Sequence, residues 1–286
     1  MVSHLTEKES NSAVDQKRFV FVELMMIWEG RVNADHISQQ FEIGIKLAGH
    51  VIQKYKNLHP ENIAYQAATE SYVSTGTFVA QFTGGTLQEY IQLIAAGESV
   101  TQLSMPTRNV NPIAVRPILQ AIRENKRLNI AYASVSHPEF TKRIIQPHNI
   151  VFDGLRWHVR AFCEKNNGYR DFVLSRFDAS TPSEILDGAD HYDLEDELWQ
   201  TILDVDIIPD PRLDENRTRI IALDYDMTKI GTATNESYIK PLKVRAALLM
   251  YLINRLGLDQ YHNKPEAQQI ILSPACQQAL KAYLPN

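Results

Sequence analysis

Basic side chains alternate with apolar ones along residues 156–162, a spacing that can build an anion site. Successive side chains of a β-strand point to opposite faces, so a strand here places Arg156, His158 and Arg160 together on one face. The other face is apolar, and Trp157 on it is expected in the core. Because a planar guanidinium can pair two oxygens at once, the basic face is suited to an anion.

Neighbouring residues can complete such a site. Arg170 and Arg176 have even spacing, so a single strand that held both would point them the same way. The ring of Tyr132 can stack on a base, and Ser134 and Ser136 can donate hydrogen bonds. These residues predict a negatively charged ligand, either a nucleotide or an oligonucleotide fragment.

An alternative interpretation gives these arginines no ligand. Exposed arginines on a strand are usually solvated, and nearby carboxylates such as Asp171, Glu164 and Asp178 could pair with them. The pattern by itself favours this solvated face.

A second set of polar residues lies near the N-terminus, on a helix predicted at residues 45–58. Its exposed candidates for contact with DNA are Lys46, His50, Gln53 and Lys54. Lysine can reach phosphate and glutamine can pair with adenine in the major groove. Residues 57–107 contain no Lys or Arg against four Glu, although phosphate contacts normally supply most of the affinity for DNA.

Helical and β-hairpin patterns in the first 107 residues position this set. Helical spacing and capping residues predict three helices, at residues 16–28, from Asn33 or Asp35 to Phe41, and 45–58. A hairpin is expected at residues 63–82, turning at Ser74-Thr75-Gly76, and then a helix at 86–96. A helix-turn-helix followed by a hairpin is a winged helix.

Short strands dominate the middle segment. After a helix from Asn111 or Pro112 to Asn125, tight turns separate predicted strands at residues 128–133, 143–151, 156–163 and 172–177. This pattern is typical of a small antiparallel barrel.

The last segment is mixed, with predicted strands at 219–224 and 267–272 and predicted helices at 241–256 and 274–283. The strongly apolar helix is either buried or an isologous dimer contact. The acidic run at 190–197 is expected to be a solvated helix start.

Composition excludes several classes of protein. The 286 residues carry a net charge of −5, and 44% are hydrophobic, as in an ordinary globular protein. The two cysteines fit a reducing cytosol, and neither a signal peptide nor a membrane-spanning run is visible. With no metal, nucleotide-loop or nucleophile–base motif, we expect a cytoplasmic protein that is not an enzyme and has no cofactor, metal or membrane partner.

Residues 115–180 resemble the WYL domain, whose name-giving triplet is here Trp157-His158-Val159. The flanking Ala131-Tyr132, Gln146-Pro147-His148 and Leu174-Ser175-Arg176-Phe177 resemble it too. Residues 41–55 resemble the turn and recognition helix of WYL transcription regulators found beside bacterial phage-defence islands, with Gly44, Gly49 and Val51 replacing two serines and an aspartate.

This resemblance implies an α+β, multidomain fold in three parts. A winged helix-turn-helix with a following helix would span residues 1–107, a WYL (Sm-like) β-barrel 108–190, and a small α/β dimerisation domain 191–286. It implies a homodimeric repressor that binds a double-stranded, palindromic operator and whose barrel senses a nucleotide-like effector. The alternative is a ligand- or protein-binding sensor whose degenerate winged helix no longer reads DNA.

Overall fold

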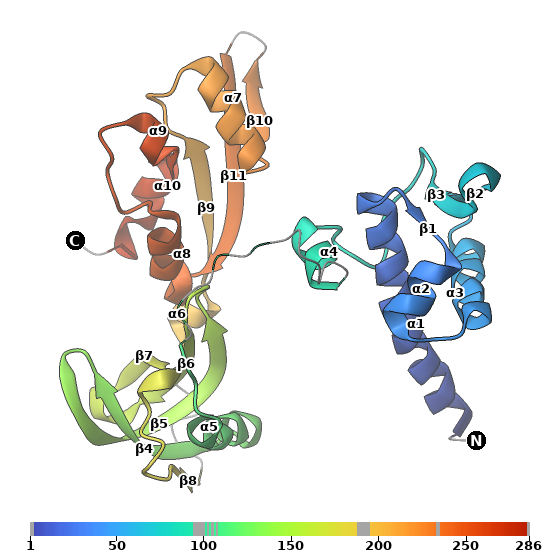
Figure 1. Ribbon diagram of the computed structural model, residues 1–286. Helices are drawn as coiled ribbons and strands as arrows, with labels where there is room; N and C mark the ends of the chain where they lie inside the picture. Colours follow the sequence, from blue (N-terminus) through green and yellow to red (C-terminus); the bar gives the residue numbers. More distant parts are fainter. Residues whose placement is uncertain are drawn as a thin grey trace. The chain divides into compact units, whose positions relative to one another are not determined.

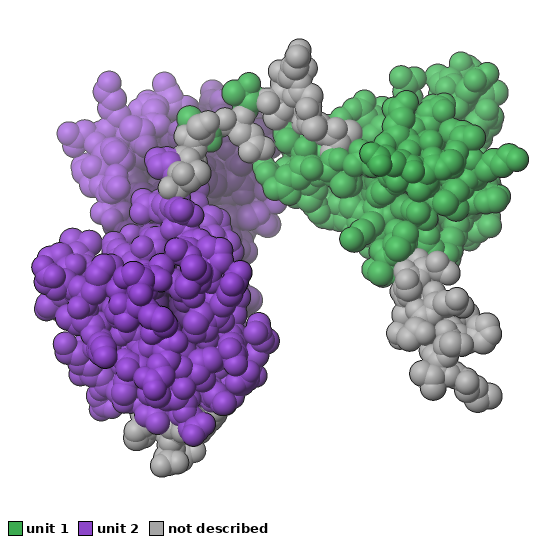
Figure 2. Space-filling model, turned by 60° about the horizontal axis from the view of Figure 1, so that its bottom comes forward, with its two compact units in different colours: residues 1–105 green, residues 106–286 purple. Residues whose placement is uncertain are grey.

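The computed structural model describes residues 3–93, 101, 103, 106, 108–187, 195–232 and 235–284, with side chains from residue 13 onward except at 232 and 235 (Figure 1). The chain divides into two compact units, residues 1–105 and residues 106–286 (Figure 2). The predicted limits at 107 and 190 lie outside the described residues, as do 94–96 of the predicted helix at 86–96 and 190–194 of the acidic run.

Unit 1 is a winged helix, as predicted. Its helices are α1 (Ser3–Trp28), α2 (Ala34–Phe41), α3 (Ile45–Leu58) and α4 (Leu87–Leu93). Its antiparallel sheet has the order β1 (Arg31–Val32), β3 (Ser71–Ser74), β2 (Ile63–Gln66). The Asn33 side chain caps α2 by accepting from the His36 amide, and α3 has the predicted bounds.

The predicted hairpin turn at Ser74-Thr75-Gly76 is wrong. The strands are short, and the turn lies at η1 (Ala67–Thr69) and Glu70, which has a left-handed φ of 46°. Buried side chains hold the segment after β3 in place of strand pairing. The carboxyl of Glu23 accepts from the amides of Gln81 and Phe82, both at 2.8 Å, and the Asn62 side chain bonds both backbone groups of Val79.

Unit 2 begins with helix α5 (Pro112–Glu124), which the Asn111 side chain caps. A five-stranded antiparallel sheet follows, in the order β7 (Gly168–Val173), β6 (Trp157–Cys163), β5 (His137–Phe152), β4 (Arg127–Ser134), β8 (Glu184–Leu186). Helix α5 packs on this bent sheet, and the two share one apolar core (Figure 1).

Two expectations for the central strands fail. Strand β7 ends at Val173, where pairing with β6 stops and the Val173 amide donates to the Tyr132 hydroxyl. Arg176 therefore lies in the 3₁₀ turn η3 (Leu174–Arg176) rather than on a strand with Arg170. Trp157 is 44% exposed, because it pairs with Phe152 directly beside the turn of the β5–β6 hairpin, beyond the core.

The rest of unit 2 is a second antiparallel sheet with helices. The order of its strands is β10 (Thr228–Thr232), β11 (Asn235–Arg245), β9 (Ile202–Pro209), β12 (Ile270–Leu272). The helices are α6 (Glu197–Gln200), α7 (Glu215–Asp224), α8 (Leu249–Leu256), α9 (Pro265–Gln268) and α10 (Pro274–Ala279). The turn η4 (Ala246–Leu248) leads into α8, and η5 (Leu280–Ala282) follows α10.

Three predictions for this part need correction. Residues 219–224 form the end of helix α7, which Asp214 caps, and not a strand. The predicted helix at 241–256 is divided, because Pro241–Arg245 pairs with β9 and only residues 246–256 are helical, as η4 and α8. Strand β12 is shorter than the predicted 267–272, since α9 occupies the preceding residues.

Among the described residues, no helix combines the length and the apolar character that crossing a membrane requires.

Candidate functional site

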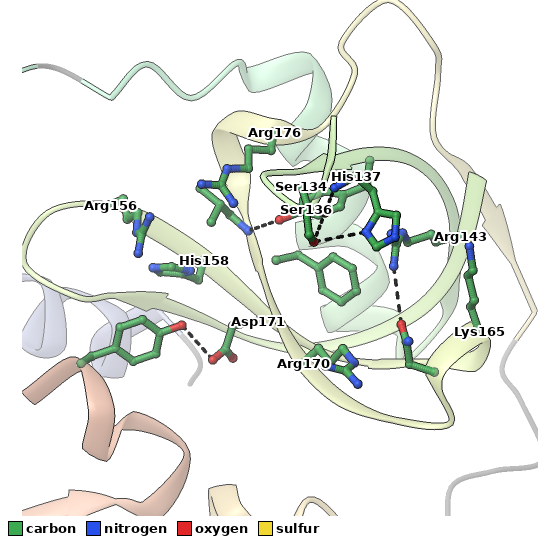
Figure 3. Close-up of a pocket in the computed structure, with 15 residues that line it drawn as sticks. Ser134, Ser136, His137, Arg143, Arg156, His158, Lys165, Arg170, Asp171 and Arg176 are labelled. Atoms are coloured by element: carbon green, nitrogen blue, oxygen red, sulfur yellow. Dashed lines mark hydrogen bonds between the residues drawn. The ribbon is translucent and has the colours of Figure 1, made fainter. Parts of the chain in front are cut away.

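A cavity of about 490 Å³ opens in the central sheet domain, between strands β4, β5, β6 and β7 and helix α8 (Figure 3). The structure brings six of the seven predicted ligand-binding residues to its wall: Tyr132, Ser134, Arg156, His158, Arg170 and Arg176. Arg160 is the exception and lies outside the lining. Sequence analysis missed several lining residues, namely His137, Arg143, Lys165, Asp171 and Tyr251.

The wall of this cavity is strongly basic. Five Lys or Arg side chains line it against one carboxylate, Asp171. Figure 3 shows Arg156 and His158 at one end and Arg143 and Lys165 at the other. In the part of the chain that the structure describes, no carboxylate lies within ion-pair distance of the Lys165, Arg170 or Arg176 side chains. The cavity therefore offers three cations that no described carboxylate neutralises.

His158 lies at the wall of the cavity and is only 2% exposed. Its Nε2 lies 2.8 Å from Oδ2 of Asp153, while its Nδ1 is buried without a hydrogen-bond partner among the described residues. Burial raises the pKa of the Asp153 carboxyl, but hydrogen bonds from His158 and from the Arg156 and Leu155 amides outweigh burial and bring that pKa to about 2. Asp153 is thus ionised and fixes the orientation of the imidazole at the wall of the cavity.

Arg160 is a structural residue rather than an exposed one. It is 5% exposed, and its guanidinium donates to both oxygens of Asp196, at 2.7 and 2.9 Å, and to Asp171 at 3.3 Å. The alternation of side chains along β6 correctly predicted that Arg160 lies on the face opposite the apolar one. Arg160 is nevertheless buried, because it contacts Asp196, the residue that caps the distant helix α6.

The same contact corrects the prediction for the acidic run. Asp196 is the N-cap of α6, yet it is 7% exposed rather than solvated. Burial raises the pKa of its carboxyl, but the hydrogen bonds and charge of Arg160 outweigh burial and hold it below its usual range.

The cavity is joined to helix α8 through Asp171. The Tyr251 hydroxyl donates to Oδ2 of Asp171 at 2.9 Å, and the Tyr251 ring lies 5.0 Å from the His158 ring. Burial raises the pKa of Tyr251, and the Asp171 charge raises it further, so the hydroxyl stays a proton donor. Sequence offered no signal for this contact, because 80 residues separate the two partners.

Tyr132 does not fit the stacking role expected for it. Its ring is 5% exposed, with edge-on contacts to Phe172 and Phe177. The Arg143 guanidinium lies 5.9 Å from that ring, and the Arg143 Nε is buried with no hydrogen-bond partner in the described part of the chain. Tyr132 is thus a buried residue of the cavity wall that packs against Phe172 and Phe177.

The four predicted DNA-contacting residues are all exposed on α3. They differ in what they contact within the protein. Lys54 forms an ion pair with Asp15 of α1, and Gln53 donates to the Tyr72 hydroxyl of β3. Among the described residues, Lys46 and His50 have no such partner. Arg31 was not singled out from the sequence. It adds an exposed cation on β1, beside the β2–β3 hairpin, which contains no Lys or Arg.

Family comparisons match all three parts of the chain. Residues 15–96 match the BrxR transcriptional regulator winged helix-turn-helix domain, residues 114–182 the WYL domain, and residues 202–280 the BrxR transcriptional regulator C-terminal dimerization domain.

Curated relatives match along nearly the whole length. The DNA-binding transcriptional repressor CapW of Escherichia coli (strain KTE188) is 30% identical over 278 residues, covering 90% of this chain and 88% of the relative. CapW of Pseudomonas aeruginosa is 30% identical over 275 residues, with the same coverage, and CapW of Stenotrophomonas maltophilia 25% over 276 residues, covering 91% and 89%. The chain therefore belongs to the CapW/BrxR family of WYL-domain transcriptional regulators.

One solved structure, the proteasome accessory factor B/C (PafBC) of Arthrobacter aurescens, aligns with 94% of this chain and 47% of its own, at 15% identity and a TM-score of 0.27. This chain thus spans about half the length of that protein.

Proposed function

We propose that this protein is a homodimeric DNA-binding transcription regulator, a repressor that an anionic, nucleotide-like ligand releases from its operator. The single observation that carries the ligand half of the proposal is the basic cavity of the central domain. Lys165, Arg170 and Arg176 line it without carboxylate partners among the described residues.

The DNA half of the proposal rests on relatives and on the winged helix. The curated relatives are named DNA-binding transcriptional repressors, and one matched domain is named for dimerization. Lys46 and His50 are exposed near the start of α3, where a recognition helix meets the major groove. A two-fold dimer would read a palindromic site. The family resemblance adds the target, an operon in or beside a phage-defence island.

Release requires that the ligand favour one dimer geometry over another. The contact of Asp171 with Tyr251 supplies a route, because it joins the cavity wall to a helix of the part matched to the dimerization domain. An anion bound beside Asp171 repels the Asp171 carboxylate. This repulsion acts on the hydrogen bond between Asp171 and Tyr251.

The test is binding of the purified protein to the DNA upstream of its own gene, followed by fluorescence anisotropy over a range of salt concentrations. We expect sequence-dependent binding that weakens steeply with salt, because counterions are released from phosphate. Equal affinity for random DNA at every salt concentration would refute the repressor function.

A second candidate, a sensor whose winged helix no longer reads DNA, is favoured by one feature of α3. Its N-terminal turn exposes Ile45 and Leu47, at 48% and 46%, while Lys54 is neutralised by Asp15. An apolar surface of this kind suits a protein partner. The DNA-binding experiment separates the two candidates.

A further inference from the structure

A second basic groove adjoins the ligand cavity. Its volume is about 270 Å³, and it lies between the β5–β6 turn of the central domain and helix α8. Arg156 and Tyr251 line both hollows, so the groove continues the cavity. The other residues of its wall are Arg108, Asp153, Leu155, Asn254 and Arg255.

Two cations of this groove have no carboxylate partner among the described residues. Its one carboxylate, Asp153, is occupied by His158, by Arg156 and by two backbone amides. Arg108 and Arg255 are exposed, and no carboxylate of the described residues pairs with either of them. The groove therefore has an unneutralised positive charge at its rim.

The β5–β6 turn is shaped to let Arg255 lie against it. Gly154 adopts a left-handed φ of 88°, and a Cβ built there would meet the Arg255 guanidinium, whose Nε would lie at 3.3 Å. Glycine removes both the backbone strain and the crowding. The guanidinium thus lies over the turn, beside Arg156, where its donors can face a ligand in the groove.

We infer that this groove is a second phosphate subsite, and that the ligand is a phosphodiester-linked oligonucleotide spanning cavity and groove, not a mononucleotide. The inference rests on the proposed function, since it extends the same cavity. A mononucleotide fills only one of two adjoining basic hollows, whereas an oligonucleotide places successive phosphates in both. Its backbone meets Arg170 and Arg176 in the cavity, then Arg156, then Arg108 and Arg255 in the groove.

The test compares thymidine 5′-monophosphate with single-stranded oligothymidylates of increasing length. Calorimetric binding uses the full chain with Lys46→Ala and His50→Ala, so that the winged helix does not bind the probes. We expect oligothymidylates to bind about tenfold or more tightly than the monophosphate, because each Arg–phosphate contact adds charge-assisted hydrogen bonds. In the same background, Arg255→Ala and Arg108→Ala should lose that gain yet keep the affinity for the monophosphate.

Salt dependence separates a phosphate contact from a structural effect. Each lost contact should reduce the slope of log affinity against log salt by about 0.7 for a single strand. Arg255→Lys should keep most of the slope because it keeps the charge, and Lys281→Ala, which removes an exposed cation that lines neither hollow, should change nothing.

Each other outcome overturns a defined part of the account. Equal affinity for the monophosphate and for every oligothymidylate would refute the second subsite while leaving the cavity as an anion site. An unchanged slope in Arg255→Ala and Arg108→Ala would refute it equally. Binding of neither probe would refute the proposed ligand site as well.

Discussion

The arginines of the central domain divide into two groups according to their carboxylate partners. Arg160 is buried between Asp196 and Asp171, whereas Arg170 and Arg176 face the cavity without such partners among the described residues. Alternation along a strand predicted which side chains share a face. It could not predict the partners, because Asp196 is 36 residues from Arg160 in the sequence.

This division predicts opposite effects for two matched substitutions. Arg160→Ala should lower the free energy of unfolding by about 3–5 kcal/mol, because it leaves buried carboxylates unpaired. Arg176→Ala should change stability by no more than about 0.5 kcal/mol, yet weaken binding of thymidine 5′-monophosphate about tenfold. Urea denaturation and calorimetry measure the two effects. Equal loss of stability in both variants would contradict the division.

Asp153 predicts an acid dependence of stability. Its pKa is about 2 in the folded protein, below the ordinary 3.8, so the folded state favours the ionised form. The stabilisation is complete above about pH 4 and is lost as the pH falls toward 2; its size is about 2 kcal/mol. The difference in unfolding free energy between wild type and Asp153→Asn should therefore shrink over this range. A constant difference would contradict the assignment, and Asp187→Asn, an exposed carboxylate, serves as control.

Among the helices and strands, local sequence signals were sufficient to predict an element where its capping residue and its hydrophobic periodicity agree. Helix α3 has its predicted bounds, and Asn33 and Asn111 cap the helices that follow them. Elements whose conformation depends on distant partners were not predictable. Pro241–Arg245 is a strand because β9 pairs with it, and the segment after β3 is held by Glu23 and Asn62.

The candidate site was predictable to a similar degree. Six of the seven predicted side chains line one cavity, since four lie on neighbouring strands of one sheet and Arg156 and Arg176 lie in turns next to those strands. The contribution of Tyr251 was not predictable, because helix α8 reaches the cavity only through the tertiary fold. Whether these residues bind a ligand stays a prediction.

Helix α3 predicts unequal roles for its two lysines. Lys46→Ala should weaken operator binding and reduce the slope of log affinity against log salt by about 0.9, the value for one phosphate contact on duplex DNA. Lys54→Ala should have a smaller effect because Asp15 already neutralises that lysine, and Asp15→Asn should tighten binding. Anisotropy titrations at several salt concentrations measure these slopes, and identical slopes for the two lysine variants would refute the assignment.

Across the whole molecule, release of DNA by a ligand requires coupling between the cavity and the remainder of unit 2. Asp171 links them, since it accepts from Tyr251 of α8 and from Arg160, which in turn holds Asp196 of α6. A ligand that disturbs Asp171 therefore acts on two helices outside the sheet at once.

Removal of one hydroxyl should separate binding from response. Tyr251→Phe keeps the ring beside His158 but loses the hydrogen bond to Asp171, at a cost in stability of about 1.5–3 kcal/mol. We expect ligand affinity to stay within about threefold of wild type, while release of DNA by ligand is lost. Unimpaired release in this variant would show that the coupling follows another route.

The central claim is that an anion in the central cavity releases the protein from DNA, and the most direct measurement is dissociation of a preformed complex. Labelled DNA from upstream of the gene is bound by the wild type and by Arg176→Ala, and a single-stranded oligothymidylate is then titrated into each. The account predicts release from the wild type and a midpoint about tenfold higher for Arg176→Ala. Equal release from both would mean simple competition at the winged helix, and release from neither would mean that the cavity does not control DNA binding; both results contradict the account.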